Sequence, residues 1–227
     1  MNMREIGWVE SCYDEKFGVP RQSGVVASAW GKIRFHEDFQ SADFIRGIDG
    51  FSHLWLMFIF HQSGESVKAT VRPPRLGGND KVGVFASRSP FRPNPIGLSL
   101  VKLERVEMTK GEGAIIHVSG IDLVSGTPLL DMKPYIPYCD SVTGEGQGNA
   151  SVKSGYVTGA PENLPLEWAE GIDVSADLEK LIAETISIDP RPAYHDDERE
   201  YGCLVEGVNV RWQVVAGVVK ILSCTGV

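Results

Sequence analysis

The sequence has no hydrophobic run long enough to cross a membrane as a helix. Its longest strictly apolar stretch, residues 54–60, has seven members, whereas a bilayer requires roughly 20. The first residues, MNMRE, carry charge of both signs and are not followed by an apolar stretch like a signal-peptide core. We therefore expect a protein that works in the cytoplasm without a membrane partner.

Cysteine is scarce, and no cysteine lies close to another. The four cysteines stand at positions 12, 139, 203 and 224, so no CxxC pair is available for a zinc site or a redox dithiol. The five histidines form no HxxxH or HExxH pattern. The sequence therefore predicts ordinary thiols and no metal site.

Common phosphate-binding and hydrolase motifs are also missing. There is no GxxxxGK[ST] loop, no GxGxxG after a strand and no GxSxG turn, because Ser87 and Ser89 lie in FASRSP without the required glycines. These absences argue against a P-loop nucleotide-binding protein and against a serine hydrolase.

Charge is unevenly distributed along a chain whose net charge is −8. Residues 67–105 hold eight basic and two acidic side chains, whereas residues 160–206 hold thirteen acidic and three basic ones. A concentrated basic band on an acidic protein favours a discrete anionic ligand over simple coating of nucleic acid. The alternative is a cationic surface without a ligand.

The first 140 residues contain short apolar or alternating stretches typical of strands, and few helix-length patterns separate them. The predicted strands are residues 6–9, 33–35, 54–60, 82–85, 96–103 and 114–118. This pattern favours a mainly β fold, with an antiparallel sheet or barrel, over a doubly wound nucleotide-binding fold.

The rest of the chain predicts a second, smaller unit. Residues 141–159 are rich in glycine, serine and threonine and have no apolar period, so we place the boundary between domains 1–143 and 144–227 there. Apolar residues at helical spacing predict a helix from about 174, capped by Asp173 or Ser175 and stopped by Asp189-Pro190. Alternation over 208–214 and 218–222, around Ala216-Gly217, predicts a final hairpin. The tail is therefore a small α+β domain.

Residues 72–97, RPPRLGGNDKVGVFASRSPFRPNPIG, hold five of the thirteen prolines, four arginines and four glycines. Proline fixes the backbone, glycine permits close approach to a ligand, and arginine offers a planar fork for carboxylates and phosphates. We expect two rigid ligand-facing loops, 72–80 and 87–95, around a short strand. The alternative is that the prolines simply terminate strands.

Several longer motifs point to a known family. They are KFGVPRQ, GFSHLWLMFIFHQ, RPPRLGG, FASRSPFRPNPIGLSLV, GIDLVSGTPLLDMKPYIP and DPRPAY. Together they resemble the TrmO family of tRNA methyltransferases, also called TsaA-like or YaeB-like, over nearly the whole chain. The resemblance implies a homodimeric enzyme with a single-sheeted β-barrel. It also implies methyl transfer from S-adenosylmethionine to N6 of threonylcarbamoyladenosine next to the tRNA anticodon.

The resemblance also assigns contacts to the methyl donor. The implied donor-binding residues are Pro20, Arg21, Gln22, His61, Gln62, Arg88, Leu98, Asp122, Leu123, Val124 and Ser125. Other members often have an acidic residue where Ser125 stands. The amides, the Asp122 carboxylate, the guanidinium groups and the apolar side chains match the chemical groups of this donor.

The remaining candidates concern the acceptor. Asp131 and Tyr135 are candidates for the base that takes the N6 proton, with His61 third; the alternative for Asp131 is a structural pairing with Lys133 or an arginine. The arginine-rich loops and DPRPAY are expected to bind tRNA, with Phe91 stacking on a base or lying in the core. The predicted tRNA contacts are Arg72, Arg75, Phe91, Arg92, Arg191 and Tyr194.

Two other functions remain compatible with the residues alone. One is a tRNA- or donor-binding module that does not turn over, and the other is a barrel enzyme acting on a small anionic metabolite. Methyl transfer to modified tRNA distinguishes the first from an enzyme, and activity without RNA would identify the second.

Overall fold

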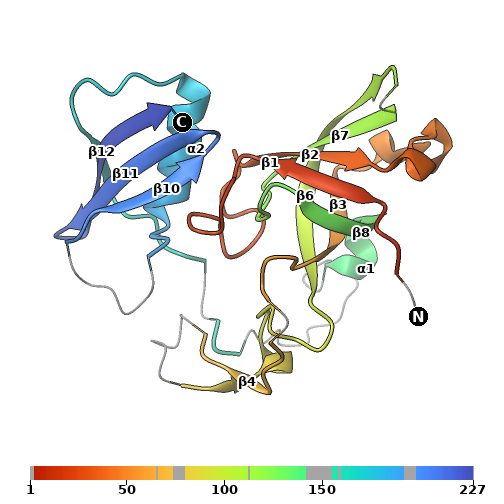
Figure 1. Ribbon diagram of the computed structural model, residues 1–227, viewed down its shortest axis with the longest axis horizontal. Helices are drawn as coiled ribbons and strands as arrows, with labels where there is room; N and C mark the ends of the chain where they lie inside the picture. Colours follow the sequence, from red (N-terminus) through yellow and green to blue (C-terminus); the bar gives the residue numbers. More distant parts are fainter. Residues whose placement is uncertain are drawn as a thin grey trace.

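The computed structural model describes residues 3–64, 66–73, 80–111, 113–141, 155–157, 160–191 and 198–226. In the first half, antiparallel strands close into a barrel in the order β1-β2-β7-β6-β3-β8, with β1 also pairing with β8 (Figure 1). The strands are β1 (Gly7–Ser11), β2 (Trp30–Phe35), β3 (His53–Ile59), β6 (Ile96–Thr109), β7 (Gly113–Ser119) and β8 (Thr127–Pro134). The predicted single-sheeted antiparallel barrel is confirmed.

The barrel interior is filled by alternate side chains of each strand, as strand geometry requires. On β3, Leu54, Leu56 and Phe58 are buried. On β6 the positions that point inward next to Phe58 hold small residues. A Cβ at Gly97, for example, would lie 2.1 Å from Cζ of Phe58, so no larger residue fits there. Leu98 therefore points outward and is 55% exposed, whereas Ser99 is 3% exposed.

Short elements connect the barrel strands. Three 3-10 turns lie between β2 and β3: η1 (Glu37–Phe39), η2 (Ala42–Ile45) and η3 (Ile48–Gly50). After β3 come β4 (Thr70–Val71), which pairs with β5 (Val82–Gly83), then η5 (Val84–Ala86); α1 (Pro137–Asp140) follows β8. The predicted strand over 82–85 is therefore strand only at its first half, and the chain turns at Val84.

The C-terminal unit is a small sheet covered by one helix. The sheet has the order β10-β11-β12-β9, and β9 runs parallel to β12. Its elements are β9 (Leu166–Trp168), α2 (Ala176–Ser187), β10 (Tyr201–Val205), β11 (Val208–Val215) and β12 (Val218–Gly226). This confirms the predicted small α+β unit; the predicted boundary at residues 143 and 144 lies outside the described residues.

Local signals explain the helix and the hairpin. The Ser175 hydroxyl caps α2 by accepting a hydrogen bond from the Leu178 amide at 3.3 Å. Ala216 and Gly217 turn the β11–β12 hairpin with φ of 50° and 78°, as a tight two-residue turn requires.

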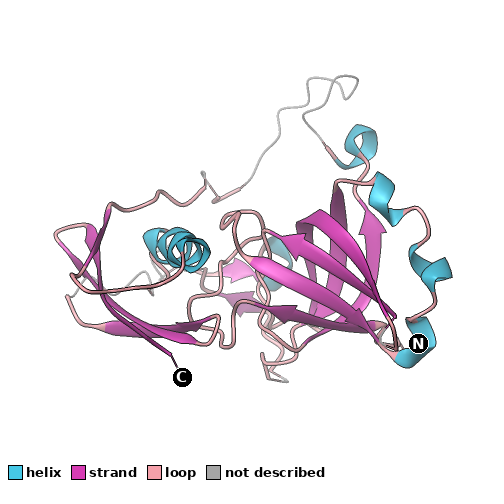
Figure 2. Cartoon of the chain, turned by 90° about the horizontal axis from the view of Figure 1, so that it is seen from above, coloured by secondary structure: helices cyan, strands magenta, loops and turns pink. Residues whose placement is uncertain are grey.

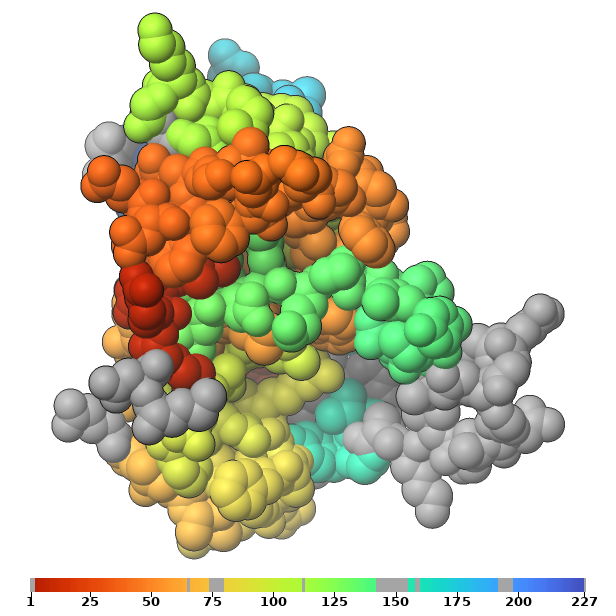
Figure 3. Space-filling view, turned by 90° about the vertical axis from the view of Figure 1, so that its right-hand side faces the viewer, coloured from red at the N-terminus to blue at the C-terminus, as the bar shows by residue number. Residues whose placement is uncertain are grey.

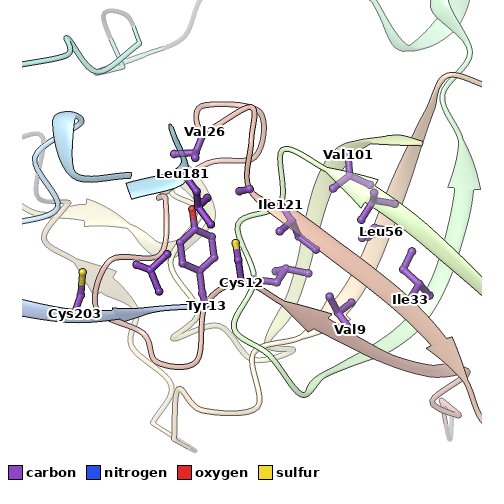
Figure 4. Close-up of a cluster of buried hydrophobic side chains, with 14 of the residues drawn as sticks. Val9, Cys12, Tyr13, Val26, Ile33, Leu56, Val101, Ile121, Leu181 and Cys203 are labelled. Carbon is purple, nitrogen blue, oxygen red and sulfur yellow. The ribbon is translucent and has the colours of Figure 1, made fainter. Parts of the chain in front are cut away.

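One hydrophobic core joins the two units. Helix α2 lies between its own sheet and the barrel (Figure 2). Ile33 and Leu56 of the barrel belong to the same buried cluster as Leu181 of α2 and the fully buried Tyr13 (Figure 4). Within the described ranges, no helix is both long and apolar enough to span a bilayer.

Candidate functional site

Three segments far apart in the sequence converge beside the barrel wall. The segment 12–29, which leads from β1 to β2, meets the segment 120–126, which follows β7: the Gly24 amide donates to the Gly120 carbonyl at 2.7 Å. The Leu100 amide of β6 donates to the Ser23 hydroxyl at 3.2 Å. Motifs predicted to bind the donor are thus brought together around β6.

A cluster of polar side chains occupies this junction. Arg88 donates a hydrogen bond from Nη1 to the Gln22 amide oxygen. The buried Ser99 donates from Oγ to the Asp122 carboxylate at 2.6 Å. We call Gln22, Arg88, Ser99 and Asp122 the polar cluster; it presents an amide, a guanidinium and a carboxylate.

Asp122 has a perturbed pKa. Burial raises its pKa from 3.8 to about 6, while the Ser99 hydrogen bond and the nearby Arg88 charge oppose that shift. The carboxylate is therefore predominantly ionised at neutral pH, although it is desolvated. A desolvated anion interacts strongly with a cationic ligand because water screens the charge poorly there.

The backbone of residues 123–125 is fixed by hydrogen bonds, and the Leu123 side chain is buried in the core. The Leu123 carbonyl accepts from Ser11 Oγ at 2.6 Å, and the Val124 carbonyl accepts from Thr127 Oγ1 at 2.6 Å. The Ser125 amide donates to the Tyr13 carbonyl at 2.8 Å. These bonds fix the course of the segment that carries Asp122.

Four other predicted donor contacts lie in the segment 12–29 and just after β3. Pro20 is buried and Arg21 is exposed, and Nη2 of Arg21 donates to the Arg191 carbonyl at 3.1 Å. His61 and Gln62 are exposed just after β3, where Lys16 Nζ donates to the Gln62 carbonyl at 2.7 Å. Lys16 thereby links the end of β3 to the segment 12–29.

Asp131 lies on β8, and Tyr135 follows directly after that strand. Asp131 is exposed on the outer face of β8, opposite Met57 of β3, and lies 3.4 Å from Lys133 Nζ, the pairing considered as the structural alternative. Tyr135 follows β8, and its ring lies near those of His53 and Trp55. Asp131 therefore shares the outer face of the barrel with Leu98, which also pairs with Met57.

The arginine-rich loop after β5 is organised by Arg92. Its Nη1 donates to the Ser87 carbonyl at 2.8 Å and, more weakly, to the Ser89 and Val84 carbonyls at 3.3 and 3.4 Å. Phe91 is half-buried, with Lys68 Nζ 4.0 Å from its ring centre. This loop region, in yellow, forms the lower part of the face in Figure 3, below β8 and α1 in green.

The second predicted tRNA segment follows α2. Arg191 donates from Nε and Nη2 to the Asp189 carboxylate at 2.7 and 2.8 Å, and its side chain is only 11% exposed. This bidentate pair shapes the turn and gives Arg191 a structural contact. Arg72 is exposed, whereas Arg75 and Tyr194 lie outside the described residues.

Two features of the site were not predicted from the sequence. Ser99 is a polar residue at an inward position of an apolar strand, which could have indicated a partner, but Asp122 lies 23 residues away. Phe85 is 78% exposed, with the Arg92 guanidinium 5.9 Å from its ring centre. An aromatic residue inside a Pro- and Arg-rich loop was the available signal.

Metal-ligating groups do not converge in the part of the chain that the structure describes, where no three His, Cys, Asp or Glu side chains form a candidate site. All four cysteines are free thiols. Burial raises the pKa of both Cys12 and Cys203 to about 12, so these two thiols are unreactive at neutral pH.

Both halves of the chain match domains of known proteins. Residues 8–141 match the tRNA-methyltransferase O N-terminal domain, and residues 167–227 match the TrmO C-terminal domain. The chain is 43% identical over 221 residues to the tRNA (adenine(37)-N6)-methyltransferase of Escherichia coli (strain K12), covering 92% of each. It is 44% identical over 176 residues to the enzyme of that name from Eikenella corrodens, covering 75% of this chain and 95% of the relative.

The fold is also similar to that of a solved structure. The crystal structure of TrmO from Pseudomonas aeruginosa matches with a TM-score of 0.80 at 31% identity, covering 100% of this chain and 98% of that chain. The similarity thus includes the C-terminal unit.

Proposed function

The chain belongs to the TrmO family of tRNA methyltransferases, and we propose that it methylates N6 of N6-threonylcarbamoyladenosine at position 37 of tRNA, using S-adenosylmethionine. The observation that carries this proposal is the polar cluster, in which three family motifs separated in sequence meet around Asp122. Both domains of the family are matched, and the E. coli relative is covered almost end to end.

The residues present suit the donor's chemistry. The donor has a carboxylate, an ammonium group, ribose hydroxyls and an adenine, so its site needs a cation, an anion, amides and apolar walls. Arg88 offers the cation, Asp122 the anion, and Gln22 and Gln62 the amides. Leu98, which is 55% exposed, offers apolar surface that is accessible to a ligand.

The chemistry demands positioning more than a reactive side chain. When bound, the donor supplies a methyl group on a cationic sulfur. The chain's task is to hold the acceptor nitrogen in line with that group, and such orientation contributes roughly 7 to 11 kcal/mol to lowering the barrier. Asp131 and Tyr135 are our candidates for removal of the N6 proton, and unchanged single-turnover methylation by Asp131→Asn would remove Asp131 from this role.

The RNA is proposed to bind the arginine-rich loops and the C-terminal unit. Arg72, Arg75 and Arg92 would face the threonyl carboxylate and the neighbouring phosphates, and Phe91 would stack on a base. Arg191 and Tyr194 of DPRPAY would complete this surface, with Arg191 acting through the turn that it forms with Asp189.

We further propose that the protein is a cytoplasmic homodimer with domains 1–143 and 144–227. The outer face of the barrel supports association. Met57 and Leu98, partners across β3 and β6, place apolar side chains there, and Trp55 and Leu100 form the next pair. Apolar residues concentrated on one outer face are typical of protein interfaces.

The direct test uses labelled S-adenosylmethionine and tRNA with or without the threonylcarbamoyl group. Label found only in N6 of the modified adenosine, identified by mass, is the expected result. Donor binding without any methyl transfer would favour the alternative, a non-catalytic tRNA- or donor-binding module. Methylation of unmodified tRNA would contradict the proposed substrate.

A further inference from the structure

We propose that the C-terminal unit is a positioning part of the donor site, because it holds the segment 12–29 that carries Pro20, Arg21 and Gln22. This inference rests on the proposed function insofar as that segment contacts the donor. It gives α2 a role in donor binding that is separate from RNA recognition.

The start of the segment is fixed to the C-terminal unit by buried contacts. The Tyr13 hydroxyl lies 3.1 Å from Thr185 Oγ1 of α2, and both residues are fully buried. Tyr13 also forms an isolated bridge with Val205, and the Glu206 amide donates to the Cys12 carbonyl at 2.8 Å. Gly18 is packed so closely that a Cβ there would lie 3.2 Å from Cβ of Cys203.

Two acidic side chains extend this attachment. Glu15 accepts a hydrogen bond from the Leu204 amide at 2.9 Å, and Asp14 accepts one from the Gly207 amide at 3.1 Å. Both amides belong to β10 and the turn that follows it. The segment thus supplies acceptors to backbone donors of β10 and the β10–β11 turn, and charged acceptors form strong hydrogen bonds.

The end of the segment is fixed by Glu184 of α2. One carboxylate oxygen, Oε2, accepts from the Ser28 amide at 2.9 Å and from the Ser28 hydroxyl at 2.8 Å. Glu184 lies one position before Thr185, so two consecutive residues of one helix hold Ser28 and Tyr13, fifteen positions apart.

The donor-binding residues lie between these two anchors. In this middle part, Arg21 donates to the Arg191 carbonyl at 3.1 Å, and Ser23 accepts from the Leu100 amide of the barrel. Residues 12–29 form no helix and no strand, apart from the isolated bridge of Tyr13. Ordering such a chain opposes binding unless it is already ordered, so anchoring by α2 lowers the entropic cost of donor binding.

The test removes the anchor and measures donor binding without RNA. We expect Glu184→Ala to raise the dissociation constant for S-adenosylmethionine, measured by titration calorimetry, about tenfold, since it removes two hydrogen bonds to a charged acceptor. Glu167→Ala is the matched control: its carboxylate lies 3.7 Å from Lys220 Nζ within the same unit. That variant loses the same charge and is expected to bind the donor like the wild type.

Hydrogen exchange of residues 14–29 without donor tests the anchoring itself. Faster exchange of these amides in Glu184→Ala than in Glu167→Ala is expected. Should Glu184→Ala fail to fold, Ser28→Ala, which loses the hydroxyl but keeps the amide bond, takes its place with a smaller expected effect. Unchanged donor affinity in a folded anchor variant would overturn the inference, whereas a wild-type protein that binds no donor would overturn the proposed donor site as well.

Discussion

At the residue scale, Asp122 is the group whose environment most constrains its chemistry. Burial raises its pKa to about 6, and Ser99 and Arg88 counter this shift. Because its folded pKa lies above the ordinary value of 3.8, ionisation of Asp122 opposes folding. This unfavourable contribution grows as the pH rises from about 4 to about 6.

We predict that donor affinity falls as the pH drops below about 6, because a neutral Asp122 no longer attracts a cationic ligand. Dissociation constants for S-adenosylmethionine between pH 5 and 8 test this. The Asp122→Asn variant should bind weakly and show little pH dependence over this range. Ser99→Ala should move the break to higher pH, since the Ser99 hydrogen bond lowers the Asp122 pKa; a break unmoved in both variants would contradict the assignment.

Phe85 gives a second prediction at this scale. Its ring is 78% exposed beside the Arg92 guanidinium, an arrangement typical of residues on which RNA bases stack. We expect Phe85→Ala to raise the Michaelis constant for tRNA about tenfold, and Phe85→Trp to preserve it. The control is Phe44→Ala, because Phe44 is 62% exposed on η2. An equal effect of both alanine variants would count against stacking at Phe85.

At the scale of elements, the loop after β5 depends on one guanidinium. Arg92 Nη1 donates hydrogen bonds to the carbonyls of Val84, Ser87 and Ser89. The side chain therefore fixes the shape of the loop and also gives it a positive charge. These two roles of Arg92 can be tested separately by substitution with lysine, which keeps the positive charge but not the planar donor geometry.

We therefore predict that Arg92→Ala and Arg92→Lys both raise the Michaelis constant for tRNA, whereas only Arg92→Ala flattens its dependence on salt concentration. Steady-state kinetics at several salt concentrations measure both quantities. Lys110→Ala, in the exposed turn between β6 and β7, serves as a control for loss of a surface charge. Full recovery by lysine would show that charge alone accounts for the effect.

The elements differ in how well the sequence predicts them. Helix α2 and the final hairpin follow local rules, namely a serine cap, helical spacing and a two-residue turn with positive φ. Strand β8 was not predicted, because Pro128, Asp131 and Pro134 interrupt its apolar pattern and its pairing with β1 and β3 is a long-range property. Strand β5 ends at Gly83 and η5 begins at Val84, whose carbonyl accepts from the Ser87 amide and hydroxyl as well as from Arg92.

The candidate site likewise combines segments that the sequence predicts with contacts that it does not predict. Sequence motifs indicated the segments that meet, and the structure brings Gln22, Arg88 and Asp122 into one region. Sequence alone could not reveal that Ser99 holds Asp122 or that Arg92 holds its own loop, since both contacts depend on how strands and turns are oriented. Nor could it place Asp131 on the outer face of the barrel, opposite Met57.

At the scale of the molecule, the outer face of the barrel bears on assembly. We predict a sedimentation mass corresponding to two chains, and a shift toward one chain in Met57→Lys, because a charge at this position would be desolvated in an interface. Asp131 lies opposite Met57, so the new ammonium group has a partner in the monomer. Met108→Lys, at a 57% exposed position, is the control. A dimer undisturbed by Met57→Lys would locate the interface elsewhere.

The core shared by the two units has a consequence for how the chain can be divided. Residues 1–141 and 155–227, produced as separate polypeptides, should recombine into a non-covalent complex, because Tyr13, Val26 and Leu181 bury one another only when both pieces are present. Co-elution of the two fragments during gel filtration would demonstrate this recombination. The covalent connection between the two units would then be dispensable for assembly. The two fragments, each fused to a different molecule, could then be used to detect binding between those molecules.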